Sequence, residues 1–261
     1  MLLKNKNAII YGAGGAIGSA VAHAFAREGA RLFLAGRTLS SLAVVANQIS
    51  RAGGLADIAE VDALNQDDVE EHLNDTIEIA GSVDISINVI SLGDVHGTPV
   101  SQMQHEQFAL PVFNAVTTQF FTATAAARQM AKQESGVILA LTANAGHHPY
   151  PNVGGFGVAC ATIEAFCRQL AVEEGKHGIR VVCLRSAGSP DAPGVDEVFH
   201  QHAAAVGYTR EQFETALAER TMLKRLPRLA EVANAAALAA SDKASAITAA
   251  VMNITCGEIA D

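Results

Sequence analysis

A glycine-rich turn near the start of the chain is the segment best suited to chemistry. Residues 7–18 read Asn-Ala-Ile-Ile-Tyr-Gly-Ala-Gly-Gly-Ala-Ile-Gly, and a helix-favouring stretch follows up to Glu28. A strand that turns tightly into a helix presents free backbone N–H groups and the positive end of the helix dipole to a phosphate. The turn therefore predicts a nucleotide site, with an ordinary glycine-rich turn as the alternative. Its binding residues would be Gly12, Gly14, Gly15, Ala16, Ile17 and Gly18.

The elements that must position this turn alternate between strand and helix along the chain. Strands are expected at 7–11, 31–35, 56–60, 84–90, 136–142, 179–184 and 249–254. Helices are expected between them at 16–28, 39–52, 66–80, 101–131, 153–174 and 229–240. Such alternation is typical of a parallel sheet with helices on both faces. The sequence therefore predicts an α/β fold with a doubly wound, seven-stranded parallel sheet of the Rossmann type.

Composition limits the class of protein and its partners. The 261 residues show an even texture without a linker, so we expect one dinucleotide-binding domain over 1–261. A net charge of −9 without a basic run argues against nucleic acid and membrane surfaces and favours a small-molecule partner. An immediate first strand leaves no room for a signal peptide, and no apolar run could span a bilayer, which indicates a cytoplasmic protein. The cysteine spacing favours neither disulfides nor a metal site.

One segment, residues 186–228, breaks the alternation. It opens with Ser-Ala-Gly-Ser-Pro-Asp-Ala-Pro-Gly and continues with helical stretches near 195–205 and 210–220. An insertion at the carboxyl end of a strand lies where ligands bind in open α/β sheets. We interpret the segment as a lid over the substrate, with a purely structural helical hairpin as the alternative.

Together these features resemble the short-chain dehydrogenase/reductase family over nearly the whole chain. The first turn of that family reads roughly Thr-Gly-x-x-x-Gly-x-Gly, and its named positions are held here by Tyr11, Gly12, Ala16 and Gly18. The resemblance implies a nicotinamide dinucleotide cofactor at this turn. It also implies a homodimer or homotetramer that packs through the long helices expected at 101–131 and 153–174.

Residues at the ends of three strands bear on the cofactor. An acidic residue after the second strand would favour NAD, whereas Gly36 and Arg37 leave room and positive charge for the 2′-phosphate of NADP. We therefore expect NADP(H) rather than NAD(H), with a solvated surface arginine as the alternative. Asp62 and Ala63 stand where the family has an aspartate near the adenine, although Asp62 is equally suited to a turn or cap. Asn88 is the residue retained from the family's Asn-Asn-Ala-Gly motif.

The catalytic positions implied by the resemblance hold none of the usual groups. The family uses a tyrosine as the acid/base, a lysine one helical turn later and a serine on the preceding strand. Counting along the chain places Phe156, Cys160 and Ala143 at these positions. The family's asparagine falls on Ala115, or on Asn114 after a slip of one residue. The usual proton relay therefore cannot operate.

Three nearby side chains are candidates to replace the missing acid. His147, His148 and Tyr150 follow the fifth strand, near the expected mouth of the pocket, and histidine titrates near neutral pH. A stiff loop with exposed imidazoles is the alternative. Arg185 is suited either to an anionic ligand group or to an ion pair with a residue such as Asp191.

Two functions remain open at this point. One is an oxidoreductase that uses NADP(H) to reduce or oxidise a small carbonyl, alcohol or activated alkene through a non-standard proton relay. The other is an NADP(H)-binding relative without turnover that acts as a sensor or an assembly subunit. We favour the oxidoreductase.

Overall fold

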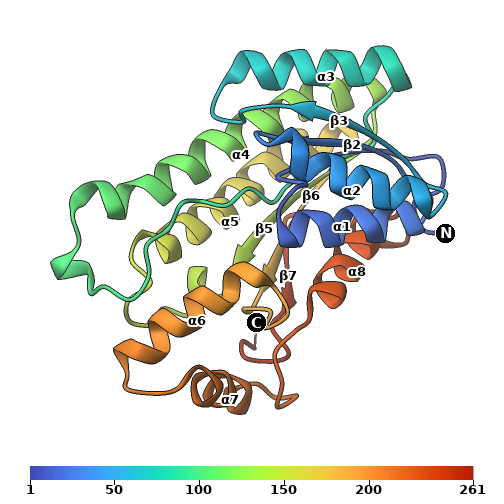
Figure 1. Ribbon diagram of the computed structural model, residues 1–261. Helices are drawn as coiled ribbons and strands as arrows, with labels where there is room; N and C mark the ends of the chain where they lie inside the picture. The colour runs from blue at the N-terminus through green and yellow to red at the C-terminus, as the bar shows by residue number, and fades with distance from the viewer. Residues whose placement is uncertain (261) are drawn as a thin grey trace.

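A parallel sheet forms the centre of the molecule (Figure 1). The computed structural model describes residues 1–260. The seven strands lie in the order β3-β2-β1-β4-β5-β6-β7, with every neighbouring pair parallel. Their bounds are β1 Asn7–Tyr11, β2 Arg31–Gly36, β3 Leu55–Glu60, β4 Ile85–Asn88, β5 Gly136–Ala143, β6 Ile179–Ser186 and β7 Ala250–Ile254. The order reverses between β1 and β4, which is where open α/β sheets form a ligand crevice. The predicted fold class is confirmed.

Helices cover both faces of the sheet. Their bounds are α1 Ala16–Arg27, α2 Leu39–Arg51, α3 Gln66–Ala80, α4 His105–Gln133, α5 Gly155–Glu174 and α8 Leu229–Ala240. One buried cluster joins the sheet to α3, α4 and α5, and a second joins it to α1, α2 and α8. Among residues 1–260, no helix combines the length and the apolar character needed to cross a membrane.

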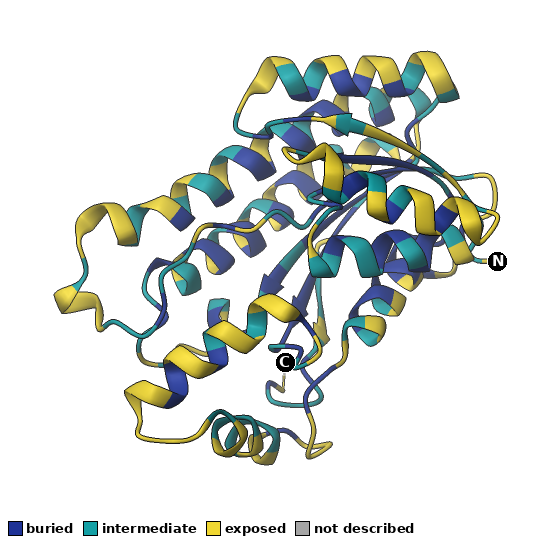
Figure 2. Ribbon diagram, in the orientation of Figure 1, coloured by how far each residue is buried: buried dark blue, intermediate teal, exposed yellow. Residues whose placement is uncertain are grey.

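Strand sequences explain why both faces are covered. In β1, Ile9 and Tyr11 enter one core, while Ala8 and Ile10 enter the other, because successive side chains of a strand point to opposite faces. A strand that is apolar at every position must be buried on both sides. Figure 2 shows the result, with buried strands between helices whose outer sides are exposed.

Most predicted bounds lie within two residues of the observed ones, and two of the differences have a clear physical cause. The fourth strand ends at Asn88, because the side-chain Oδ1 of Asn88 accepts the N–H of Ile90 at 3.0 Å and draws the chain out of the sheet. The long helix expected from residue 101 begins at His105, after a short 3-10 turn at Val100–Gln102. Reciprocal hydrogen bonds between Gln104 and Gln107 cap this helix and fix where it starts.

The segment that breaks the alternation forms two helices at the carboxyl ends of the strands. These helices are α6, Pro193–Ala205, and α7, Arg210–Arg220. In Figure 1 the arrows of β5 and β7 point toward them. A small core of Phe199 and Leu226 with partly buried neighbours joins the pair, and the Nε atom of Arg210 lies 2.7 Å from Asp196 Oδ1. The helices therefore form a compact unit beside the crevice.

Candidate active site

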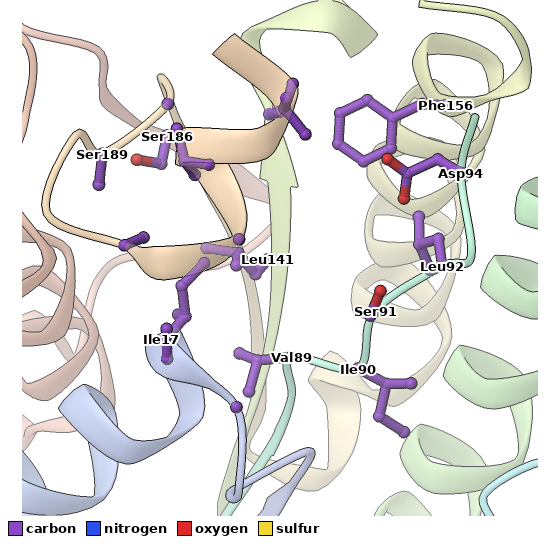
Figure 3. Close-up of a pocket in the computed structure, with 18 of the residues that line it drawn as sticks. Ile17, Val89, Ile90, Ser91, Leu92, Asp94, Leu141, Phe156, Ser186 and Ser189 are labelled. Atoms are coloured by element: carbon purple, nitrogen blue, oxygen red, sulfur yellow. The ribbon is translucent and has the colours of Figure 1, made fainter. Parts of the chain in front are cut away.

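A single cavity of about 870 Å³ lies at the carboxyl ends of the strands. The glycine turn and the end of β2 form one part of its wall, and the loops after β4 and β5 with α5, α6 and α7 form another. Figure 3 shows Ile17 and Val89 at one end of the cavity and Asp94 and Phe156 together on one wall. The predicted nucleotide turn and the predicted lid therefore border the same space.

The geometry of the turn requires glycine at two positions. Gly12 has a φ of +83°, which other residues rarely adopt, and its N–H donates to Ala35 O at 2.9 Å. A Cβ on Gly18 would overlap the backbone oxygen of Gly12. Gly15 caps α1 without a side-chain hydrogen bond, so the first N–H groups of the helix are left for a ligand. The cradle fits the pyrophosphate of a dinucleotide, and Ala16, which stands where the family motif has glycine, lines the same cavity.

At the end of β2, the cavity wall is positively charged. Gly36 and Arg37 both line the cavity, and the Arg37 side chain is exposed. Within residues 1–260, no carboxylate lies within ion-pair distance of Arg37. The acidic residues of the cavity wall are Asp62, Asp94 and Glu258, so none stands at the end of β2.

The three other predicted cofactor residues differ in position. Asp62 and Ala63 line the cavity, and Asp62 Oδ1 accepts the N–H of Leu64 at 3.0 Å, which makes it a turn residue as well. Asn88 lies outside the cavity wall: it is buried, and its Nδ2 donates to Thr122 Oγ1 on α4 at 3.1 Å. The Asn88 side chain therefore joins β4 to α4 and shapes the exit of the strand.

The family's catalytic positions do converge in the structure. Ala143 at the end of β5 and Phe156 and Cys160 on α5 all line the cavity. Burial raises the pKa of the Cys160 thiol to about 12, so it stays protonated and is a poor nucleophile. Of the two asparagine candidates, Ala115 is buried in the core, whereas Asn114 lines the cavity and donates from Nδ2 to Leu92 O at 2.9 Å.

Asn114 Oδ1 is a buried acceptor without a hydrogen-bond partner among residues 1–260, and so is Thr118 Oγ1 one helical turn away. Both residues line the cavity. Buried polar atoms are nearly always hydrogen-bonded, so this stretch of α4 is suited to a water molecule or a polar group of a ligand.

Two of the three predicted substitute acids are misplaced. His147 and His148 are exposed and are not part of the cavity wall, because both backbone N–H groups donate to Asn144 O and fold the loop so that the imidazoles face solvent. Neither imidazole borders the cavity, although both were expected near its mouth. Tyr150 does line the cavity, and burial raises its pKa well above the usual value for a phenol. Its hydroxyl therefore stays protonated.

Arg185 is part of the framework beneath the site. Its Nε and Nη2 atoms lie 2.9 Å from Glu164 Oε1 and Oε2 respectively, with both residues buried. The partner expected from the sequence, Asp191, instead accepts the N–H of Leu229 at 3.0 Å, at the start of α8. The ion pair joins β6 to α5 and leaves the anionic group of a ligand without this arginine.

The cavity contains three chemically active side chains that sequence reasoning missed. His96 Nε2 lies 2.5 Å from Asp94 Oδ2, and His96 Nδ1 lies 3.1 Å from His202 Nε2. All three residues line the cavity. The His96 ring also packs edge-on against Phe156, with 5.4 Å between the ring centroids. A hydrogen-bonded Asp-His-His chain thus stands beside the position where the family has its tyrosine.

His202 brings the lid into this chain. Its ring stacks on Phe213 of α7 and contacts Tyr150 edge-on, each with 5.8 Å between centroids. Burial, reinforced by repulsion from His96, lowers the pKa of His202 to about 4. The signal that could have found the chain was position: His96 follows β4 and His202 lies in the insertion after β6, and both places border the ligand crevice.

Comparisons with known proteins agree with this fold. The sequence profile of a family described as enoyl-(acyl carrier protein) reductase matches residues 12–258. An uncharacterized oxidoreductase of Thermotoga maritima is 28% identical over 262 residues, covering 100% of each chain. One from Bacillus subtilis is 26% identical over 250 residues, covering 94% of this chain and 88% of its relative.

Solved structures show the same architecture. An NAD⁺-bound xylitol dehydrogenase superposes with a TM-score of 0.92 at 22% identity, covering 98% of this chain and 100% of the other. An actinorhodin polyketide ketoreductase with NADPH gives a TM-score of 0.88 at 22% identity, covering 97% of each chain.

Proposed function

The chain belongs to the short-chain dehydrogenase/reductase family and is an oxidoreductase of the short-chain type, and we propose that it uses NADP(H) on a small carbonyl, alcohol or activated alkene. The main support for the proposal is the set of residues that form the cavity wall at the end of β2. Gly36 and Arg37 line the same cavity as the glycine turn, and among the described residues that line this cavity none at the end of β2 is acidic. The positions of Gly12 and Gly18 support the phosphate cradle.

The preference for NADP(H) follows from charge. A 2′-phosphate next to Arg37 would form charge-assisted hydrogen bonds, each worth about 1.5–3 kcal/mol, whereas a 2′-hydroxyl would gain little. This difference corresponds to a preference of about ten- to a hundredfold. When bound, the nicotinamide ring would exchange a hydride with a substrate carbon. Residues of the chain must then orient both partners and move the proton.

The substrate side of the cavity favours a largely apolar molecule. Ligand pockets bind apolar bodies through aliphatic and aromatic side chains and orient them with a few polar groups. Here the polar groups include the hydrogen-bonded Asp94, His96 and His202, together with Tyr150 and the lid residue Arg220. The family profile of an enoyl reductase supports an activated alkene beside a carbonyl. The apolar residues that the lid contributes are Val195, Val198, Phe199, Val206, Phe213 and Leu217.

A relative without turnover is the less favoured function. It would explain the lost tyrosine and lysine, but it leaves unexplained why hydrogen-bonded imidazoles occupy the cavity next to Phe156. The sequence relatives are named as oxidoreductases, which also supports turnover.

We also propose a two-fold homo-oligomer. Leu110, Phe113, Val116 and Phe120 recur at helical spacing on one face of α4, and about half or more of each side chain is exposed. Phe113 is 61% exposed, which is unusual for an aromatic residue unless another surface covers it. Light scattering after size exclusion should give at least twice the 27.1 kDa chain mass, and Phe113→Glu should shift the particle toward monomer. A monomeric native chain would contradict this assembly.

A fluorescence titration with NADPH and NADH tests the cofactor. We expect the native chain to bind NADPH more tightly, and Arg37→Ser to weaken NADPH binding by about ten- to a hundredfold while changing NADH binding little. Arg51→Ser is the matched control, because Arg51 is also an exposed arginine but lies at the far end of α2, outside the cavity wall.

Each other result has a distinct meaning. Binding of neither nucleotide would overturn the cofactor assignment. Tighter binding of NADH would leave an oxidoreductase with the opposite preference, and Arg37 would then be a surface residue. If NADPH binds, 2,3-butanedione and a crotonyl thioester are the first carbonyl and alkene probes for oxidation of NADPH.

A further inference from the structure

The lost tyrosine leaves a specific gap in the chemistry of the cavity. Phe156 has no ionisable proton, and the Cys160 thiol that stands at the lysine position is buried and holds its proton. A carbonyl reduced in this cavity still requires a proton on its oxygen. The group that supplies it must lie near Phe156, border the cavity and have a route for replacing the proton it gives.

The Asp94, His96 and His202 chain meets these three conditions. His96 contacts the Phe156 ring, and all members of the chain line the cavity. The chain runs from Asp94 Oδ2 to His96 Nε2, and from His96 Nδ1 to His202 Nε2. Within residues 1–260, His202 Nδ1 has no hydrogen-bond partner and is not among the fully buried unpartnered atoms, and His202 lines the cavity.

We propose that His202 Nδ1 is the proton donor and acceptor of the reaction, with His96 and Asp94 as the positioning residues that hold and return its proton. This inference rests on the oxidoreductase function proposed above and names its acid/base. The donor stands on helix α6 of the lid, whereas the family's tyrosine belongs to the helix here called α5. The proton donor is therefore complete only when the lid lies over the cavity.

Hydrogen bonding gives the three linked side chains of Asp94, His96 and His202 two states that differ by one proton. The Nε2–H of His96 donates to Asp94 in both states. When His96 also carries a proton on Nδ1, it donates to His202 Nε2, so neutral His202 holds its own proton on Nδ1 and is an acid. When His96 lacks that proton, His202 donates from Nε2 to His96, and His202 Nδ1 presents a lone pair and is a base. These tautomers are assigned from the hydrogen-bond network.

In reduction, a hydride brings two electrons to the carbonyl carbon, and the π-electron pair moves to the oxygen. That oxygen takes the Nδ1 proton of His202, while His202 Nε2 takes the Nδ1 proton of His96. His96 ends neutral, with its hydrogen bond to Asp94 intact. A proton from water then restores the state in which His96 is protonated on Nδ1. The sum is a carbonyl, NADPH and one proton giving an alcohol and NADP⁺. Oxidation runs through the same steps in reverse.

The surroundings of His202 suit this role. Its lowered pKa of about 4 keeps the ring neutral near pH 7, as the two states require. Of the titratable groups, His96 from the loop after β4 and Tyr150 from the loop after β5 contact His202 directly, while Asp94, Cys160, Arg220 and Glu258 line the same cavity. Phe213 of α7, which covers one ring face, carries no charge. Burial raises the pKa of the Tyr150 phenol, which keeps its hydroxyl protonated near pH 7.

The test begins with a readout that needs no turnover. Long-range ¹H–¹⁵N spectra of the native chain labelled in histidine report the tautomer and charge of each ring. We expect a neutral His202 ring between about pH 5 and pH 8. His202→Phe, which retains the aromatic contact with Phe213, should shift the ring signals of His96. Asp94→Asn should shift both rings, and His147→Ala with His148→Ala should move neither.

Kinetics then separate the acid from a structural role. With NADPH and whichever of 2,3-butanedione or the crotonyl thioester turns over, His202→Phe should lower kcat by about 10²- to 10⁴-fold while NADPH affinity by fluorescence stays within about threefold. Asp94→Asn should displace the pH profile of kcat, because it removes the charged acceptor of the His96 Nε2–H. The double variant of His147 and His148 should retain the native rate.

Two results would overturn the proposal. The first is that the native enzyme is active and His202→Phe leaves its kcat unchanged. The second is that the ring signals of His96 do not shift in His202→Phe. If neither nucleotide binds, the cofactor assignment fails, and the ring spectra alone decide whether the chain of imidazoles exists. If no probe turns over, the same spectra decide.

Discussion

The two sides of the cavity are built from different parts of the polypeptide. On the proposed cofactor side, glycines with only backbone atoms to offer make up much of the wall: they belong to the Gly12 turn, the N-terminus of α1 and the end of β2. On the substrate side, the wall is made by side chains from the loop after β4, from α5 and from the lid. His96 and His202, which share a hydrogen bond, are 106 residues apart in the sequence.

This difference explains why one side keeps the family pattern and the other does not. In the glycine turn, backbone atoms pack directly against other backbone atoms, so an added side chain is not tolerated. A Cβ on Gly18, for example, would overlap the Gly12 oxygen. Side chains in a cavity can be exchanged without moving the main chain, as Phe156 shows at a position where the family has tyrosine. The chemistry of the site can therefore change while the phosphate cradle stays.

The largest effect should come from a substitution that disrupts the glycine turn on the cofactor side of the cavity. Gly18→Val places a branched side chain on the backbone oxygen of Gly12, and this overlap can be relieved only by moving the turn. We expect NADPH binding to become undetectable by fluorescence titration, together with a lower midpoint of thermal unfolding. Native binding in this variant would show that the turn is not the phosphate site.

Gly15→Ala is the matched control for that change. A Cβ on Gly15 meets only the Gly12 oxygen, at an ordinary contact distance of 3.5 Å, and Gly15 does not have a positive φ. NADPH affinity should stay within a few-fold of the native value. Equal losses from Gly15→Ala and Gly18→Val would mean that chain flexibility, rather than the Gly18 contact, controls binding.

The same contrast decides how much could be predicted from sequence. Strand and helix periodicity with glycine turns predicts most element bounds, because these signals are local; α3 at Gln66–Ala80 matches its prediction fully. The loop histidines His147 and His148 were given a role from their place in the sequence, but the 3-10 turn before them directs both rings to solvent. The His96 to His202 contact depends on how the lid packs, which no local pattern encodes.

A buried histidine beneath the cofactor side should give the next largest effect. His72 on α3 packs edge-on against Tyr11 at the end of β1, with 5.8 Å between centroids, and its Nδ1 has no hydrogen-bond partner among residues 1–260. Burial lowers its pKa to about 4. Unlike His202, which belongs to a hydrogen-bond network, His72 contributes only to packing.

The sign of its pH effect follows from linkage. Between the unfolded value of about 6.5 and the folded pKa, the unfolded chain binds more protons than the folded one, so stability falls as pH falls through this window. The loss should approach about 3 kcal/mol near pH 4. Urea unfolding at pH 7 and pH 4.5 should show that His72→Phe reduces the drop, while His105→Gln, at an exposed position, leaves it unchanged. An unchanged drop in His72→Phe would assign acid sensitivity to other groups.

The smallest effect should come from Asp62, whose side chain stabilises a backbone turn and also borders the cavity. Its Oδ1 atom accepts the N–H of Leu64, and the residue also lines the cavity, on the side that we propose holds the adenine of the dinucleotide. An asparagine at this position keeps the Oδ1 acceptor and loses only the charge, whereas alanine loses both. If Asp62 serves the turn alone, Asp62→Asn should bind NADPH like the native chain, and Asp62→Ala should be less stable by about 0.5–1.5 kcal/mol. If it also contacts the adenine amino group, Asp62→Asn should weaken NADPH up to about tenfold at unchanged stability, because a charged acceptor forms the stronger hydrogen bond. We expect this second result, and the titration and urea unfolding together separate it from the first.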